Sequence, residues 1–356
     1  MRIGLRAPIW IPAALVIVLA GALLFGRLPP SAVPLPPRSQ APPPAATPPP
    51  AAAPTRPAED PIDGERVPVA QAGRRPIAVI VENYPQARPQ WGLSQAVRVY
   101  EAITEGGVTR YLAIFGERDA DRVGPVRSAR TQFLSYVLEV DAPLAHVGGN
   151  ADALDLIAAA RVKDLDQFRY AGAYRRLFRP GLAYEHTVFT STAALRDLAN
   201  QKGWGETIAP DPPAWKDDNA PDHQPPNQRV TINFSGPQYA VLWVYRPSTN
   251  DYQRFLAGQA DTDAANGHAI TAKVVAAAVV PRTHGRTRIR EDTWTFADIG
   301  SGKAWIFQDG MATAGTWKKR SRTDRLIFFD QDGKEVVFTR GPQWMEIMPP
   351  EVSPIF

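Results

Sequence analysis

Residues 76–208 alternate short apolar runs with longer amphipathic stretches. The runs have the length of buried strands, and the stretches place apolar residues at helical spacing. Strands that alternate with helices predict an α/β domain, with a mixed sheet flanked by helices. The predicted strands are 77–81, 97–103, 111–117 and 142–147, and the predicted helices are 130–140, 151–162 and 192–203.

The pattern changes after residues 209–228, a segment with six prolines. Downstream, runs such as YAVLWVYR, KAWIFQDG and KEVVFTRG are rich in β-branched and aromatic residues and are separated by turn residues. Such runs are typical of strands joined by tight turns. We therefore predict a Pro-rich interdomain linker over 209–228 and a mostly antiparallel, β-rich C-terminal domain over 229–350.

The N-terminal segment follows neither pattern. Residues 8–26 carry no charge over a length that can span a bilayer core, and two arginines precede them. The positive-inside rule places the rest of the chain outside the cytoplasm. We predict a transmembrane anchor within residues 1–27, with a cleaved signal peptide as the alternative. Residues 28–75 are rich in proline and alanine and predict a disordered, extended linker.

The net charge of +4 arises in this N-terminal segment. Residues 1–75 hold eight arginines and four acidic residues, whereas residues 76–356 hold 32 basic and 32 acidic side chains. A nucleic-acid-binding protein needs a basic folded face, so we expect no nucleic-acid partner. The chain has no cysteine, which excludes disulfides, thiol chemistry and cysteine-ligated metals.

The stretch GPVRSAR, residues 124–130, holds the first candidate chemistry. Ser128 is a candidate N-cap for the helix that follows, and a helix N-terminus offers free N–H groups and a positive dipole end. Arg127 and Arg130 add planar guanidinium groups that suit a carboxylate or a phosphate. This combination predicts an anion-binding site.

Internal pairing of the same arginines is the alternative. The alternation of VRVYEAI places Glu101 among apolar neighbours, where a carboxylate needs a partner. Glu105 and Arg110 follow nearby, so an arginine–glutamate network could form without a ligand. The two interpretations can coexist, and we expect Arg130 to pair inward and Arg127 to be free for a ligand, with Glu101 orienting the arginines.

A second feature is HVGGN, residues 146–150. Gly148 and Gly149 allow a close backbone approach, Asn150 is a candidate helix cap, and loops at strand ends line the usual ligand crevice of α/β sheets. If the strands run parallel, this loop and GPVRSAR open at the same edge. His146 and His186 could act as acid/base groups or bind a metal, and satisfied, partly buried histidines are the alternative.

The other motifs with known chemistry are missing. No metal-type spacing accompanies the histidines, and the calcium-like run DTDAANG has Ala265 in its fifth position. The chain has no G-x-S-x-G, no P-loop and no G-x-G-x-x-G. We therefore expect neither a metal nor a cofactor.

The stretches NYPQARPQWGLSQA, VYEAITEGGVTRYLAIF, GPVRSAR, HVGGN and EHTVFTS, in this order, resemble the YerB-like family of bacterial envelope proteins. The resemblance continues into the C-terminal stretch GTWKKRSRTDRLIFFD. It implies an N-terminal α/β domain, a separate C-terminal domain and no established reaction. Many relatives look like lipoproteins with a lipid-modified cysteine, which this chain lacks. The resemblance implies one site formed by Glu101, Glu105, Arg110, Arg127, Ser128, Arg130, His146, Gly148, Gly149 and His186.

Three functional hypotheses follow. The first is a membrane-tethered, extracytoplasmic protein that binds an anionic envelope ligand, such as a cell-wall precursor, or an envelope protein partner. In it, Arg127 and Arg130 contact the anion and Gly148 and Gly149 line the cleft. The second is an enzyme that acts on phosphate-containing envelope material, with His146 or His186 as acid/base. The third is a purely structural interaction module.

Overall fold

The computed structural model describes residues 58–178, 180–205, 212–218 and 228–356. The predicted membrane anchor and residues 28–57 of the predicted linker lie outside these ranges. Within the described ranges, no helix combines the length and the apolar character needed to cross a membrane.

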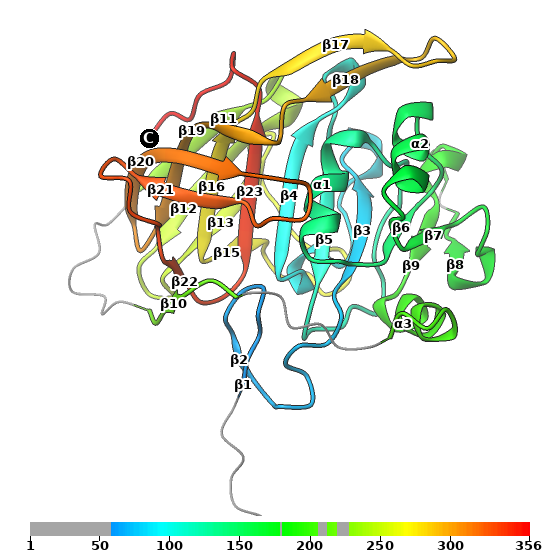
Figure 1. Ribbon diagram of the computed structural model, residues 1–356, viewed down its shortest axis with the longest axis horizontal. Helices are drawn as coiled ribbons and strands as arrows, with labels where there is room; N and C mark the ends of the chain where they lie inside the picture. Colours follow the sequence, from blue (N-terminus) through cyan, green and yellow to red (C-terminus); the bar gives the residue numbers. More distant parts are fainter. Residues whose placement is uncertain (1–57, 179, 206–211, 219–227) are drawn as a thin grey trace, which may run out of the picture. The chain divides into compact units, whose positions relative to one another are not determined.

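A mixed ten-stranded sheet forms the centre of the fold (Figure 1). The order of its strands is β21-β20-β19-β16-β23-β4-β5-β3-β6-β7. Parallel and antiparallel pairs both occur, which confirms the prediction of a mixed sheet. The strands are β3 (Ile77–Glu82), β4 (Arg98–Ile103), β5 (Thr109–Phe115), β6 (Leu144–His146), β7 (Asp164–Asp166), β16 (Val274–Val279), β19 (Gly300–Gln308), β20 (Met311–Lys319), β21 (Ile327–Asp330) and β23 (Gln343–Met348).

The helices also follow the predicted pattern. They are α1 (Thr131–Glu139), α2 (Ala151–Ala159) and α3 (Thr192–Gln201), each within the range expected from the apolar spacing. The side chains of Asn150 and Ser191 cap α2 and α3 by accepting backbone N–H bonds. Ser128 does not cap α1 as predicted, because the helix begins at Thr131 and the N-cap position is Arg130.

The two predicted regions share the central sheet. Strand β23 lies near the C-terminus of the chain, yet it pairs in parallel with β4 of the N-terminal region and with β16 of the C-terminal region. All six of its residues are buried. The sequence pattern predicted the β-rich C-terminal region correctly, but it did not show that this region completes the sheet of the first.

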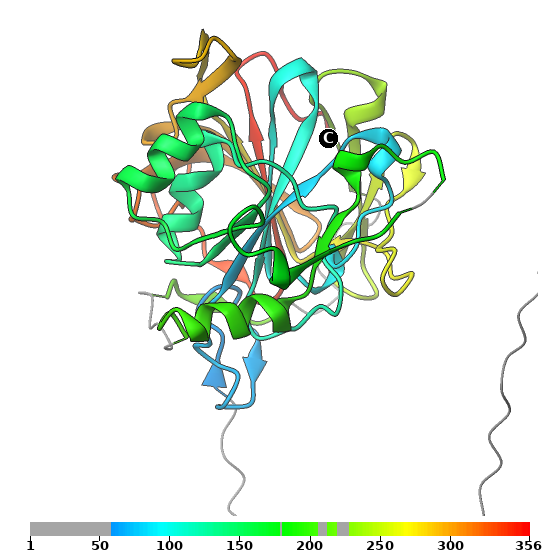
Figure 2. The ribbon, with the colours of Figure 1, turned by 90° about the vertical axis from the view of Figure 1, so that its right-hand side faces the viewer.

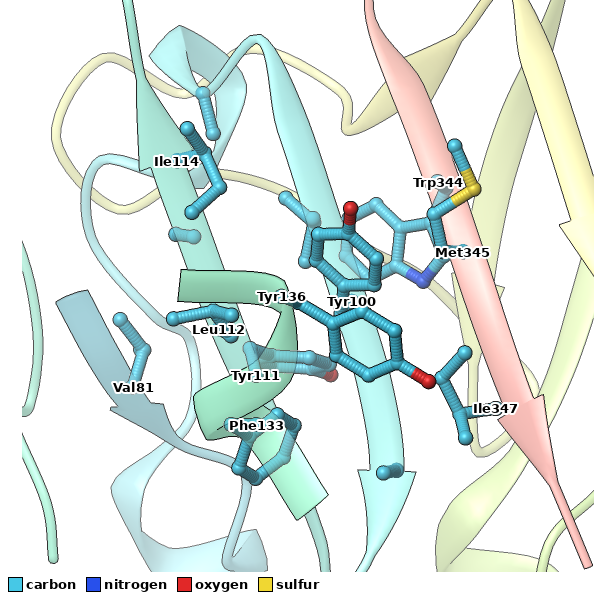
Figure 3. Packing of buried hydrophobic residues seen from close by; sticks show 14 of the residues in the cluster. Val81, Tyr100, Tyr111, Leu112, Ile114, Phe133, Tyr136, Trp344, Met345 and Ile347 are labelled. Atoms are coloured by element: carbon cyan, nitrogen blue, oxygen red, sulfur yellow. The ribbon is translucent and has the colours of Figure 1, made fainter. Parts of the chain in front are cut away.

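Different layers cover the two faces of the sheet (Figure 2). On one face α1 packs through Tyr136, whose ring stacks on Tyr100 of β4 with centroids 4.3 Å apart (Figure 3). On the other face lies a second sheet, whose Trp243 contacts Trp344 of β23 with ring centroids 5.3 Å apart. The second sheet consists of β11 (Arg229–Asn233), β12 (Ala240–Arg246), β13 (Asp251–Leu256), β14 (Gln259–Ala260) and β15 (Thr271–Ala272).

Short two-stranded pairs complete the fold. Residues 58–75 were predicted to belong to the disordered linker, but they are folded, because Ile62 is buried and its carbonyl accepts a bond from Arg98 at 2.6 Å. Residues of the predicted interdomain linker also pair, with β10 parallel to β22. The pairs are β1 (Ala58–Glu59) with β2 (Arg66–Val67), β8 (Tyr174–Arg176) with β9 (Val188–Thr190), β10 (Trp215–Lys216) with β22 (Phe338–Thr339), and β17 (Arg282–Arg286) with β18 (Asp292–Phe296).

Candidate functional site

An open pocket of about 350 Å³ collects most of the predicted charged residues. It is lined by the end of β3, the 3₁₀ turn Glu105–Gly107, the start of β5, the loop before α1 and the 3₁₀ turn Tyr184–His186. All of these segments belong to the N-terminal region. We call it the arginine pocket and define it by Arg110, Arg127, Arg130, Glu82, Glu105 and His186.

Three other pockets are larger, but none of the arginines that line them has a buried nitrogen without a partner among the described residues. One, of about 400 Å³, is lined by Arg74 and Arg196, which both pair with Asp119. A second, of about 930 Å³, contains Arg282, which pairs with Glu351. A third, of about 390 Å³, contains Arg122, which stacks on the ring of Trp91. The arginine pocket is therefore the better candidate on chemical grounds.

Arg127 is paired in the structure, contrary to the prediction that it is free. Its guanidinium forms an ion pair with Glu82, the last residue of β3. The same carboxylate lies 3.0 Å from Nδ1 of His186, whose ring stacks on Tyr84. Glu82 is buried, while the Arg127 side chain keeps a quarter of its surface exposed. Glu82 therefore orients Arg127, in the role that the sequence analysis gave to Glu101.

Arg130 is paired inward, as predicted. Its Nε donates to Glu105 at 2.7 Å, and both side chains are partly exposed at the pocket. A further bond, from its guanidinium to the carbonyl of Ala129, fixes the side chain against the loop.

Arg110 is the unusual member of the pocket. It is buried, its terminal NH1 group donates to the carbonyl of Ser128 at 2.8 Å, and its Nε has no hydrogen-bond partner among the described residues. Burial, followed by repulsion from Arg130, lowers the pKa of Arg110 to about 10. A group with this pKa is still protonated at neutral pH, so the pocket holds a third cation that no carboxylate pairs directly.

Glu101 lies outside the arginine pocket. Its carboxylate accepts a bond from Arg254 at 2.6 Å and another from Thr109 at 2.7 Å. Arg254 also pairs with Asp261, and both Arg254 and Glu101 are fully buried. The carboxylate does have a partner, as predicted, but this partner is an arginine of the second sheet. We call Arg254, Glu101, Asp261 and Glu346 the core ion cluster.

The loops GPVRSAR and HVGGN lie side by side, but not for the predicted reason, because the strands before them, β5 and β6, run antiparallel to each other and not parallel. The N–H of Ala129 donates to the carbonyl of Gly148 at 2.9 Å, and the N–H of Val147 donates to the carbonyl of Arg127 at 3.0 Å. The space at the glycines is occupied by the protein, because a Cβ at Gly148 would come within 3.0 Å of the Phe168 ring. Gly148 and Gly149 therefore do not line the pocket.

Asn150 and His146 are also engaged elsewhere. Asn150 caps α2 and donates to Thr293 at 2.9 Å. His146 is fully buried, with Nδ1 bonded to the Gly148 carbonyl and Nε2 3.0 Å from Asp164. Of the two predicted histidines, only His186 lines the arginine pocket.

Sequence reasoning missed Glu82, although a signal was present. The run IAVIVE ends in a charged residue directly before Asn-Tyr-Pro. A carboxylate at the end of a buried strand indicates the edge of the sheet, where pockets of α/β folds open. Tyr84 and Glu185, which also line the pocket, stand in turns that carry no comparable signal.

Comparison with known proteins agrees with this architecture. Residues 63–205 match the model of the N-terminal domain of a protein of unknown function, DUF3048, and residues 230–345 match that of its C-terminal domain. The chain is 30% identical over 292 residues to "Putative lipoprotein YerB" of Bacillus subtilis, covering 81% of this chain and 86% of that protein.

The crystal structure of YerB from Bacillus subtilis superimposes with a TM-score of 0.74 at 26% identity. The match covers 84% of this chain and all of that one. Together with the two domain matches, it shows that the chain belongs to the YerB-like (DUF3048) family of unknown function.

Proposed function

We propose that this protein is tethered to the membrane on its extracytoplasmic side and binds an anionic ligand of the cell envelope in the arginine pocket. The observation that carries the proposal is Arg110. A buried guanidinium with an unpartnered Nε is costly unless an anion satisfies it, since unmade bonds to charged groups are expensive.

The neighbours of Arg110 support the same ligand class. Arg127 and Arg130 hold their carboxylates at the pocket and stay partly exposed, so each can add a planar pair of donors to a bound oxyanion. Phosphate and carboxylate groups fit this geometry. A cell-wall precursor with a phosphate or a peptide carboxylate is a ligand of this chemistry, and an acidic segment of a cell-wall synthesis protein is a second one.

Two observations support the proposed membrane location: the name of a relative and the uncharged residues 8–26. The Bacillus subtilis relative bears the name "Putative lipoprotein YerB", which fits attachment to a membrane. This chain has no cysteine to carry a lipid, and its uncharged N-terminal stretch has the length of a single membrane span. The predicted linker would hold the folded part away from the bilayer.

His186 favours a second candidate, an enzyme that acts on phosphate-containing envelope material. Glu82 binds Nδ1 of its ring, and no described residue hydrogen-bonds Nε2, which is the arrangement of an oriented acid/base group. Turnover of a phosphate ester that His186→Gln abolishes, with the fold intact, would decide for this candidate.

Anion binding tests the main proposal. Inorganic phosphate, pyrophosphate and soluble nucleotide-linked cell-wall precursors are added to the full-length protein, and thermal unfolding and calorimetric binding are measured. We expect at least one of them to stabilise the wild type, and Arg110→Gln to weaken binding by about tenfold or more, since each charged hydrogen bond contributes roughly 1.5–3 kcal/mol.

The matched control is Arg74→Gln, which removes an arginine from a different pocket and should leave anion binding unchanged. If no anion stabilises the wild type, or if Arg110→Gln binds as tightly as the control, the anion-binding proposal is wrong. The structural interaction module then becomes the better hypothesis.

A further inference from the structure

Three buried carboxylates gather at the end of β5 that is opposite to the arginine pocket. Asp60 and Asp63 belong to the turn between β1 and β2, and Glu117 follows β5. One oxygen from each lies within 4.8 Å of the other two, and all three residues are at least 95% buried. From these contacts we infer a binding site for a hard divalent cation, calcium, at Asp60, Asp63 and Glu117.

Two oxygens of the cluster have no partner. Asp60 Oδ1 accepts the backbone N–H groups of Ile62 and Asp63, but Asp60 Oδ2 is buried and accepts nothing from the described residues. Glu117 Oε2 is buried and unpartnered in the same way. Buried carboxylate oxygens are normally satisfied, so these two atoms indicate a missing ligand.

The charge of the cluster points to a divalent cation. Arg118 is the nearest counter-charge, with Nε 2.9 Å from Glu117 and NH2 3.3 Å from Asp63. One guanidinium against three carboxylates leaves a formal charge of −2 in a buried site. Arg98 is close to Asp60 and shares its partner Glu139 with Lys319, so it reduces the formal charge to −1, which still favours a cation.

The ligand atoms favour calcium over the softer metals. All three side chains offer oxygen, which calcium binds at about 2.3–2.6 Å in irregular geometries, with water filling the positions that the protein leaves. The turn is held in place independently of a cation, because Gly64 donates to the Asp60 carbonyl at 2.9 Å and Gly341 donates to that of Asp63. Gly116 leaves room for Asp60 Oδ2, since a Cβ there would lie 3.1 Å from it.

Calcium is expected to stabilise the full-length protein after treatment with EDTA. At a hundredfold excess over its Kd, calcium chloride should raise the Tm by roughly 5 °C, and EDTA should reverse the rise. Asp63→Asn and Glu117→Gln keep the shape of the side chains and should each abolish the shift. Asp155→Asn, at an exposed carboxylate paired with Arg288, is the matched control and should keep it.

Terbium luminescence provides a second measurement. The ring of Trp215 packs against Gly64, the residue after Asp63, so terbium bound in place of calcium should emit when tryptophan is excited. Trp215→Phe should reduce this emission while the stabilisation by calcium remains. Arg110→Gln should leave both signals unchanged, which separates this site from the arginine pocket.

Several outcomes would overturn the inference. One is a Tm that none of calcium, magnesium or manganese at millimolar concentration changes, together with equal terbium emission from wild type and Asp63→Asn. Another is stabilisation by magnesium or manganese but not calcium, which would reject the calcium assignment. A third is a higher Tm for Asp63→Asn in EDTA with no response to cations in the wild type, which would show that the carboxylates share protons instead.

Discussion

The arginine pocket and the core ion cluster are built from the same residue types, but they differ in access to solvent. In the pocket, Arg127 and Arg130 pair with Glu82 and Glu105 and keep part of their surface exposed. In the cluster, Arg254 and Glu101 are sealed between the two sheets. An arginine in a solvent-accessible ion pair can exchange its carboxylate for a ligand. A buried ion pair between the two sheets cannot be opened without separating them.

The two clusters also differ in the sign of their unmatched charge. The pocket has Arg110 as a cation that no carboxylate pairs directly, and this guanidinium is the group that we propose binds an anion. The core ion cluster has three carboxylates around one arginine. A proton on Glu346 reduces this negative surplus, because burial, followed by repulsion from Glu101, raises the pKa of Glu346 to about 8. Of these two clusters, only the arginine pocket is therefore a candidate for ligand binding.

Removal of Arg254 should have the largest effect on stability. Arg254→Met leaves Glu101 and Asp261 buried without their cation, which we expect to lower the free energy of unfolding by about 3–5 kcal/mol. Urea denaturation measures the loss. Arg130→Met, which breaks a partly exposed pair, is the control and should cost about 1 kcal/mol or less. Equal losses in the two variants would contradict the distinction between the clusters.

Glu346 should make stability depend on pH. Its pKa is raised from 4.5 to about 8 in the folded protein, so the folded state holds a proton that the unfolded state releases between these values. The contribution of this group is complete below pH 4.5 and is lost as the pH rises through about 8.

Glu346→Gln keeps an oxygen to accept the bond from Trp243 but cannot ionise. In the wild type, the free energy of unfolding should fall by up to about 1.4 kcal/mol per pH unit between pH 4.5 and about 8 because of this group, and the variant should lack this fall. Denaturation at several pH values compares the two slopes. Parallel curves for wild type and variant would show that Glu346 does not carry the proton.

Loss of Arg127 should have only a small effect on stability. Arg127→Gln removes one partner of Glu82, but His186 remains 3.0 Å from that carboxylate, so we expect a cost of about 1 kcal/mol. Addition of Glu82→Gln should recover most of it, and addition of Glu101→Gln should not. Recovery by the Glu101 change instead would mean that the pairing described for the two clusters is wrong.

Local patterns predicted the secondary structure well, because strand and helix periods depend on neighbours in the sequence. Four predicted strands and three predicted helices of the first region have counterparts in the structure. The pairing of Arg130 with Glu105 was also predictable, since the two residues lie only 25 positions apart in the sequence, on either side of β5. The partner of Glu101 was not, because Arg254 lies 153 positions away on another sheet.

The turn over residues 60–63 shows a different limit. Composition assigned it to the linker, because proline and alanine dominate the preceding residues. The turn folds because Arg98 and Gln343 both donate to the carbonyl of Ile62, and Gln343 lies 281 positions away from it. A segment that is ordered by distant partners carries no local signal, so the three carboxylates could not be grouped from the sequence.

The position of β23 has a consequence for how the chain reaches its native state. Gln343 of β23 pairs with Arg98, 245 positions earlier, so the middle of the central sheet is missing until almost the whole chain has been synthesised. Until then β4 has an open edge, and such edges can pair with other chains. Contacts this distant in sequence also form slowly. A chain delivered across a membrane from its N-terminus would thus need protection from self-association until its last strand arrives.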